Sequence, residues 1–211
     1  MTIKQRYNYC LRKWEEALPN PEGELHYNDP FELLVAVMLS AQCTDKRVNM
    51  VTPSLFAEYP TVQDMANASV QDILTFIYSV SYPNSKAAHL SAASKMIVED
   101  FGGEVPDTVE ELTRLPGVGR KTANVVCAVM WQQPTMAVDT HIFRVAERIG
   151  LTTGSKSPLH TEQVLVRYIP QDLIPKAHHW ILLHGRYICV ARKPHCEKCA
   201  LTEVCRYFKM H

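Results

Sequence analysis

The sequence has no long apolar run. No stretch of its 211 residues approaches the roughly twenty apolar residues of a membrane-spanning helix. The opening segment, MTIKQRYNYCLRKWEEALPN, also lacks the apolar core of a secretory signal peptide. These absences argue against a membrane or secreted protein and predict a cytoplasmic one. The apolar share of 46% is ample for a buried core.

Alternating strand patterns, two-residue hairpin signals, repeats and low-complexity tracts are also lacking. The single short strand candidate is Met136–Val138, which stops at Asp139. Helical spacing of apolar residues prevails elsewhere, and Asp29 and Pro30 provide a cap and a first residue for one helix. We therefore predict an all-α fold. The expected helices cover about 30–39, 69–78, 85–101, a short segment from 108, 120–131 and 140–149.

The chain carries no net charge, although most nucleic-acid-binding proteins have a basic excess. Its charge is nevertheless unevenly distributed. Residues 1–110 hold 8 Lys and Arg against 15 Asp and Glu, a balance of −7, and residues 111–211 hold 14 against 7, a balance of +7. This asymmetry is compatible with a nucleic-acid face in the second half, but it is equally compatible with an acidic solvated surface in the first.

Seven cysteines form an odd number, and without a secretory signal a disulfide framework is not expected. Four of them fall close together near the end, with six, two and five residues between them: Cys189, Cys196, Cys199 and Cys205. Thiolates at such spacing predict a metal site, and the ligand type alone leaves zinc and an iron–sulfur cluster equally open. The other three, Cys10, Cys43 and Cys127, have no partner spacing and receive no function.

A glycine-rich turn, Leu115-Pro116-Gly117-Val118-Gly119, lies between two predicted helices. Its backbone amides and the first turn of the following helix could bind a phosphate, because amides there carry partial positive charge and have no intrahelical acceptor. Glycine also allows a phosphodiester to approach the main chain. A simple connection between helices, with glycines chosen only for their conformation, is the alternative.

Lys121 begins the helix after this turn, where the helix dipole and the neighbouring Arg120 disfavour its protonated state. A neutral amine is what a nucleophilic lysine requires. A phosphate-binding or solvated lysine is the alternative. Asp139, in Val138-Asp139-Thr140-His141, can cap the helix at 140–149, and a capping aspartate can also be catalytic.

Taken together, these segments resemble the endonuclease III family of bifunctional DNA glycosylases, over essentially the full length of the chain. The matching stretches are FELLVAVMLSAQ at 31–42, LPGVGRKTA at 115–123, VDTH at 138–141 and the cysteine tail. The resemblance implies a helix-hairpin-helix at the glycine turn. It also implies that Ala36 and Lys121 distinguish the chain from adenine glycosylases, which have a glutamate and a non-lysine residue at these two places.

The implied reaction is removal of oxidised pyrimidines from duplex DNA. Lys121 would attack C1′ of the damaged nucleotide and form a Schiff base, and β-elimination would then cleave the strand 3′ to the abasic site. Asp139 would assist deprotonation and stabilise positive charge on the sugar. A non-catalytic DNA-binding protein and an iron–sulfur electron carrier are the alternatives from other classes.

The resemblance also implies how DNA is held. Because the target nucleotide must be extruded, residues have to fill the gap, and Gln42 would be one of them. Tyr82 stands where the family has a leucine wedge, so either Tyr82 would stack on bases at this position or the wedge would lie elsewhere in the chain. The expected phosphate contacts come from the turn and from two basic residues between the first cysteines: Gly117, Val118, Gly119, Arg120, Arg192 and Lys193.

Two helical lobes are implied by the same resemblance. Residues 23–133 would form a six-helix domain containing the helix-hairpin-helix. Residues 1–22 and 134–211 would form a discontinuous helical domain, whose four cysteines bind a [4Fe–4S] cluster with a structural role. We expect a monomer whose partner is double-stranded DNA containing damaged pyrimidines or abasic sites.

Overall fold

The computed structural model describes residues 1–210 and confirms the all-α prediction: this part of the chain contains helices, turns and loops, and no strand. The one short strand candidate, Met136–Val138, forms no strand, because the segment has no regular secondary structure. None of the described helices combines the length and apolar character that crossing a membrane requires.

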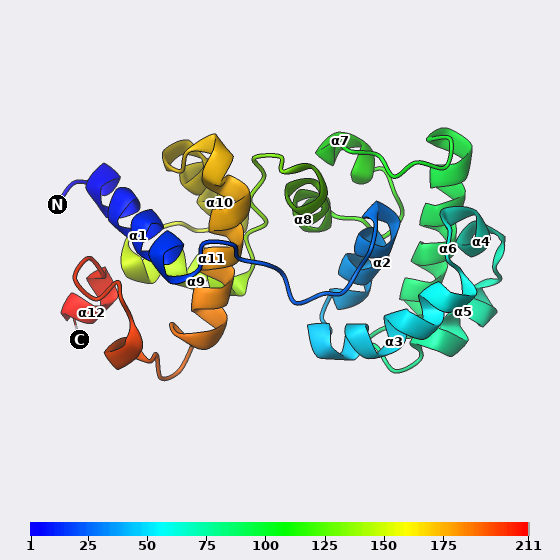
Figure 1. Ribbon diagram of the computed structural model, residues 1–211, viewed down its shortest axis with the longest axis horizontal. Coiled ribbons are helices and arrows are strands. Elements are labelled where there is room, and N and C mark those ends of the chain that lie inside the picture. Colours follow the sequence, from blue (N-terminus) through cyan, green and yellow to red (C-terminus); the bar gives the residue numbers. More distant parts are fainter. Residues whose placement is uncertain (211) are drawn as a thin grey trace. The chain divides into compact units, whose positions relative to one another are not determined.

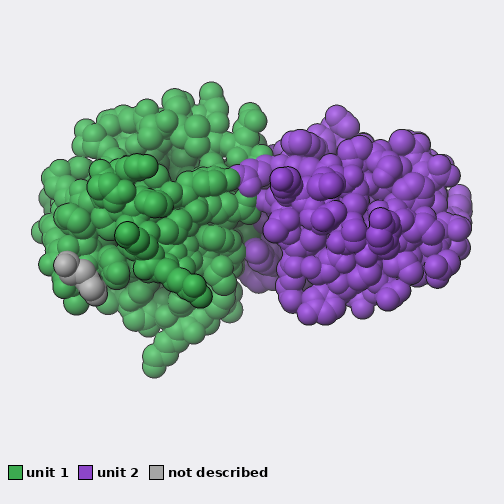
Figure 2. Space-filling model, turned by 90° about the horizontal axis from the view of Figure 1, so that it is seen from below, with its two compact units in different colours: residues 1–23, 132–211 green, residues 24–131 purple. Residues whose placement is uncertain are grey.

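The chain divides into two compact units, coloured separately in Figure 2. Unit 2 is continuous and comprises residues 24–131. Unit 1 is discontinuous and comprises residues 1–23 and 132–211, so the first helix of the chain packs with helices from its second half. Each unit has its own cluster of buried apolar side chains.

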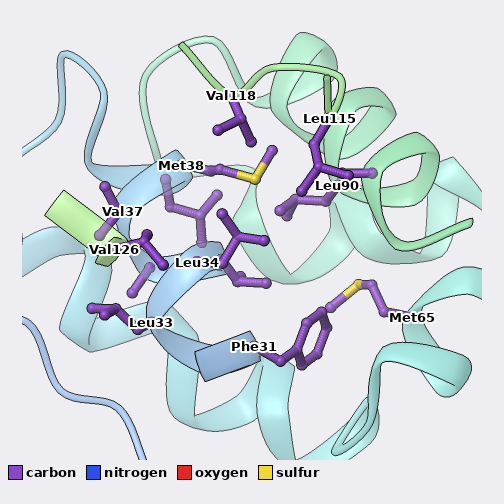
Figure 3. Packing of buried hydrophobic residues seen from close by; sticks show 14 of the residues in the cluster. Phe31, Leu33, Leu34, Val37, Met38, Met65, Leu90, Leu115, Val118 and Val126 are labelled. Carbon is purple, nitrogen blue, oxygen red and sulfur yellow. The ribbon is translucent and has the colours of Figure 1, made fainter. Parts of the chain in front are cut away.

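Unit 2 is built around helix α2 (Pro30–Ser40), where every residue from Phe31 to Leu39 is buried. Figure 3 shows Leu34 and Met38 of this helix among Leu90, Leu115 and Val126. Because these side chains are fully enclosed, truncation of one to alanine should cost about 2–5 kcal/mol. Helix α2 packs against α3 (Asp45–Glu58), α6 (Pro83–Asp100) and α8 (Arg120–Trp131). The other helices of unit 2 are α4 (Val62–Asn67) and α5 (Val70–Ile77), which pack on α6, and α7 (Val109–Leu112), which packs on α8.

Local signals explain where these helices begin. The Asp29 carboxylate accepts the backbone N–H of Glu32 at 2.8 Å, and Pro30 occupies the first helical position of α2. The Glu32 carboxylate reaches the N–H of Asn28 at 2.7 Å instead of completing a reciprocal bond with Asp29. Helix α6 starts two residues earlier than predicted, at Pro83, and ends before the left-handed pair Gly102 and Gly103.

Unit 1 contains α1 (Ile3–Ala17), α9 (Thr140–Ile149), α10 (Pro158–Tyr168), α11 (Ile174–Tyr187) and α12 (Arg206–Met210), with short 3₁₀ turns at Gln171–Leu173 and Cys196–Lys198 (Figure 1). Helix α9 packs against α10, α11 and α12. Arg6 of α1 reaches the C-terminal segment, because its Nε donates to the Val204 carbonyl at 3.1 Å and its guanidinium also bonds the Gly150 carbonyl. The first helix is therefore tied to the segment that carries the cysteines.

Candidate functional site

The glycine turn connects α7 and α8 and has the conformation that its sequence predicts. Gly117 adopts a left-handed φ of +78°, which glycine tolerates and other residues rarely adopt. The side chain of Val118 is buried in the core of unit 2, and its N–H donates to the Leu115 carbonyl at 3.1 Å. The Val118 amide is thus occupied within the turn, whereas the backbone at Gly117 and Gly119 is exposed.

Lys121 and Arg120 form the start of α8 and are both exposed. Helix α8 runs from Arg120 to Trp131, as the sequence predicts, so Lys121 lies in its first turn immediately after Gly119. Anions are favoured at this end of a helix because of the unsatisfied amides and the helix dipole. The structure therefore places an exposed amine beside a backbone suited to phosphate.

Asp139 is the N-cap of α9, as predicted. Its Oδ1 accepts the backbone N–H of His141 at 2.9 Å and that of Ile142 at 2.8 Å. The carboxyl group is half-buried, and these two bonds fix its orientation at the start of the helix. Oδ1 can therefore cap the helix while the other carboxylate oxygen, Oδ2, still accepts a hydrogen bond or a proton from a substrate.

Gln42 and Tyr82 are exposed and share an uncommon backbone conformation. Gln42 follows the end of α2 with φ +54°, and Tyr82 precedes α6 with φ +56°. Left-handed conformations are rare for residues other than glycine, and they cluster at functional sites. The Ser81 hydroxyl donates to the Gln42 carbonyl at 2.8 Å, so the two segments are adjacent within unit 2.

The four spaced cysteines surround one small cavity in unit 1, together with side chains that include Ile149, Ile188, Pro194 and Tyr207. In residues 1–210 no set of three or more His, Cys, Asp or Glu side chains is placed to hold a single metal ion. The thiols are arranged around a space and do not converge on one point. Four thiols around one cavity provide a donor set that could hold an iron–sulfur cluster.

The cysteine thiols influence one another electrostatically. Burial, together with the neighbouring thiols Cys205, Cys189 and Cys196, raises the pKa of Cys199 to about 11. Burial and then Cys189 and Cys205 also raise the pKa of Cys196. Several thiolates in so small a space repel each other, so holding them together would require cations that neutralise their charge.

Two arginines of α9, which sequence reasoning missed, hold the beginning of the cysteine loop. The Arg148 guanidinium donates to the carbonyls of Val190 at 2.8 Å and Ala191 at 2.7 Å. Arg144 Nε donates to the Cys189 carbonyl at 3.1 Å. Their spacing of four residues places both on one face of α9, but which carbonyls they meet depends on the tertiary fold.

The basic pair between the first two cysteines is exposed, as a DNA-contacting loop requires. Arg192 and Lys193 lie in a segment without regular secondary structure between α11 and the 3₁₀ turn at Cys196–Lys198. The backbone before them is fixed by Arg148 and the backbone after them by the His195 N–H, which donates to the Ile188 carbonyl at 2.9 Å. The loop is therefore closed at both ends.

The chain is similar in sequence to known DNA repair proteins. Residues 35–171 match the model of the HhH-GPD superfamily base excision DNA repair proteins. Endonuclease III of Rickettsia felis is 48% identical over 204 residues, covering 97% of this chain and 95% of the relative. Endonuclease III of Escherichia coli strain K12 is 43% identical over 197 residues, covering 93% of each.

Solved structures agree with these relatives. A trapped endonuclease III–DNA covalent intermediate superimposes with a TM-score of 0.93 at 41% identity, covering 100% of this chain and 99% of the other. A thermostable thymine-DNA glycosylase shares the fold, with a TM-score of 0.88 at 21% identity over 99% of this chain and 98% of the other. The resemblance inferred from the motifs is thus confirmed. The chain belongs to the endonuclease III family of base excision DNA repair enzymes, which are DNA glycosylases with abasic-site lyase activity.

Proposed function

We propose that the protein removes oxidised pyrimidines from duplex DNA through a Schiff base on Lys121 and then cleaves the strand 3′ to the abasic site. The observation that carries this proposal is the position of Lys121, exposed in the first turn of α8 directly after the glycine turn. A lysine that follows a phosphate-binding backbone is held near the sugar of the bound strand. Support also comes from the solved covalent endonuclease III–DNA intermediate, which shares 41% of its sequence with this chain.

The first step is displacement of the damaged base. The Lys121 Nζ forms a bond to C1′ of the sugar as the glycosidic bond breaks, and the bonding electrons leave with the base. Loss of a proton from nitrogen and opening of the sugar ring give an imine between Nζ and C1′. We assign the proton transfers and the stabilisation of the positively charged sugar to the Asp139 carboxylate, which the amides of His141 and Ile142 hold in one orientation.

The second step is strand cleavage. The protonated imine makes the proton on C2′ acidic, and its removal is followed by rupture of the bond between C3′ and the 3′ phosphate oxygen. The phosphate leaves with the bonding electrons on the downstream strand, and an unsaturated aldehyde remains on the upstream strand once water releases Lys121. No external oxidant or reductant is needed.

We assign the DNA backbone contacts to the amides of Gly117 and Gly119 and to Arg120, Arg192 and Lys193. Val118 belongs to the same proposed contact, although its amide also donates to the Leu115 carbonyl within the turn. Contacts of this kind position the duplex without reading its sequence. The exposed side chains of Gln42 and Tyr82 would fill the gap left by the extruded nucleotide. Extrusion costs the duplex base stacking worth a few kcal/mol.

A [4Fe–4S] cluster would be held by Cys189, Cys196, Cys199 and Cys205, which surround a common cavity. When bound, it supplies iron–thiolate bonds that close the loop containing Arg192 and Lys193. The glycosylase chemistry requires no electron transfer, so we assign the cluster a structural role. The proposed partner is double-stranded DNA with damaged pyrimidines or abasic sites, bound by one copy of the chain.

The strand products from a duplex containing one thymine glycol test this function. We expect breakage without alkali treatment, with an unsaturated aldehyde on the upstream fragment and a phosphate on the downstream fragment. A duplex that releases the base but breaks only after alkali treatment would contradict the lyase step. An intact glycosidic bond under the same conditions would contradict the proposed lesion class.

A further inference from the structure

The left-handed backbones of Gln42 and Tyr82 need support from elsewhere in unit 2. Tyr82 is 65% exposed and Gln42 is exposed as well, so burial of their own side chains does not fix them. A non-glycine residue keeps a left-handed backbone only where several contacts with the surrounding structure hold it there. The source of that support is visible in the contacts of Lys86.

Lys86 is a buried lysine, with only 8% of its surface exposed. Its Nζ donates to the Leu39 carbonyl at 2.8 Å and to the Ala41 carbonyl at 2.7 Å. These carbonyls lie at the C-terminal end of α2, where helix carbonyls lack intrahelical donors. A cation is also favoured at this end by the helix dipole, so Lys86 caps α2 from a different helix, immediately before Gln42.

The backbone of Lys86 contacts the second segment. Its N–H donates to the Tyr82 carbonyl at 3.1 Å in the first turn of α6. Ser81 completes the connection, because its hydroxyl donates to the Gln42 carbonyl at 2.8 Å. Lys86 therefore bonds both the end of α2 and the residue that precedes α6. Ser81 links the same two segments directly.

We propose that Lys86 is a positioning residue that presents Gln42 and Tyr82 as a prearranged pair for insertion into the duplex. The inference rests on the proposed function, in which these two side chains fill the space of the extruded nucleotide. Lys86 does not touch the reacting atoms. Its ammonium group fixes the chain at 39–41, and its helix fixes Tyr82, so ordering of the pair is completed before DNA binds.

A lysine that only stabilised the fold would affect every substrate equally, whereas a positioning residue would not. Extrusion is required for a damaged base paired in a duplex, but it is not required for an abasic site in single-stranded DNA. The two substrates therefore separate the two roles. Base release from the duplex reports insertion, and borohydride trapping on the single strand reports the Schiff base chemistry alone.

The experiment compares the intact protein with its Lys86→Met variant, which keeps most of the side-chain volume and loses the donor. Lys95→Met is the matched control, because Lys95 lies on the same helix and is exposed. We expect Lys86→Met to slow single-turnover release of thymine glycol from duplex DNA by about tenfold or more, since displacement of a positioning group by about 1 Å can cost up to a hundredfold. Trapping on single-stranded abasic DNA should match that of the intact protein, and Lys95→Met should leave both rates unchanged.

Equal losses on both substrates, or no loss on the duplex, would overturn the inference. If Lys86→Met does not fold, the same two rates are measured for Ser81→Ala, which removes the other contact between the two segments. Removal of the Ser81 hydroxyl should produce the same duplex-selective loss at smaller size, and an unselective effect would again overturn the inference. Failure of the intact protein to trap abasic DNA in either form, single-stranded or duplex, would instead contradict the proposed function on which the inference rests.

Discussion

Gly117 packs so closely against His89 that no side chain fits at this position: a Cβ built on Gly117 would lie 2.7 Å from the Cβ of His89. The left-handed φ of +78° at Gly117 independently disfavours other residues. The two constraints have different origins, since one is steric contact with α6 and the other is local backbone geometry. Together they explain why the turn before Lys121 contains glycine here.

We expect Gly117→Ala to lower the free energy of unfolding by about 1–3 kcal/mol, because the substitution adds backbone strain and a contact with His89. Gly119→Ala is the control, since a Cβ added at Gly119 would have no neighbouring atom within 4 Å and the φ of this residue is not left-handed. Chemical denaturation of both variants measures the difference. Equal stability of the two variants would contradict this account of the turn.

Asp139 combines a structural and a proposed catalytic role, and two substitutions separate them. Asp139→Asn keeps an oxygen for the N–H groups of His141 and Ile142, so stability should change by less than about 0.5 kcal/mol. Asp139→Ala removes the cap and should cost about 1 kcal/mol. Both should reduce thymine-glycol release at least about a hundredfold, because each removes the carboxylate. Retention of activity in a stable Asn variant would show that Asp139 is only a cap.

The arginine that holds the cysteine loop should control cluster content. Arg148→Met removes the donors to the Val190 and Ala191 carbonyls, so the loop should close less reliably around the cavity. We expect iron and acid-labile sulfide per chain to fall by about half or more, in line with the tenfold or greater losses of affinity seen when supporting contacts of metal ligands are removed. Arg167→Met, which changes an exposed arginine of α10, should retain the full content. Equal content in both variants would show that Arg148 does not support the cluster.

Cys127 should make the stability of the protein depend on alkaline pH. Its thiol is fully buried and donates to the Asp107 carbonyl at 3.3 Å. Burial, and to a lesser extent Asp107, raises its pKa from 9.0 to about 11. The folded state therefore holds this proton more tightly than the unfolded state, so the contribution is complete below pH 9 and is lost as the pH rises to about 11.

Cys127→Ala removes this group and leaves a small cavity. The variant should be less stable than the intact protein at neutral pH. Between pH 9 and 11 the difference in unfolding free energy should become smaller, because only the intact protein loses the thiol contribution. Thermal or denaturant unfolding across this range measures it, and a constant difference would contradict the assignment.

Local sequence signals were sufficient for much of the fold. Helix α8 has its predicted bounds because the glycine turn ends before Arg120, and α9 begins at Thr140 because Asp139 caps it. These features depend on neighbours in the sequence, such as a cap and the two N–H groups that follow it. The short strand candidate at Met136–Val138 forms no strand, in agreement with the all-α prediction, because a strand needs a pairing partner that a three-residue pattern does not specify.

The supporting contacts could not be predicted in the same way. Lys86 lies in a helix pattern that gives no indication that its ammonium group caps α2, about 45 residues earlier in the chain. The left-handed conformation of Gln42 is likewise set by tertiary contacts, since glutamine has no local preference for it. The sequence indicates which residues have suitable chemistry, whereas the structure shows what holds them in place.

Borohydride trapping of Lys121 tests the central claim most directly. The intact protein and its Lys121→Gln variant would be incubated with duplex DNA containing an abasic site, in the presence of borohydride to reduce any imine. We expect a covalent protein–DNA adduct with the intact protein and none with the variant, whose unfolding curve should remain unchanged because Lys121 is exposed. Undiminished adduct formation by Lys121→Gln would contradict the account, as would the absence of an adduct with the intact protein.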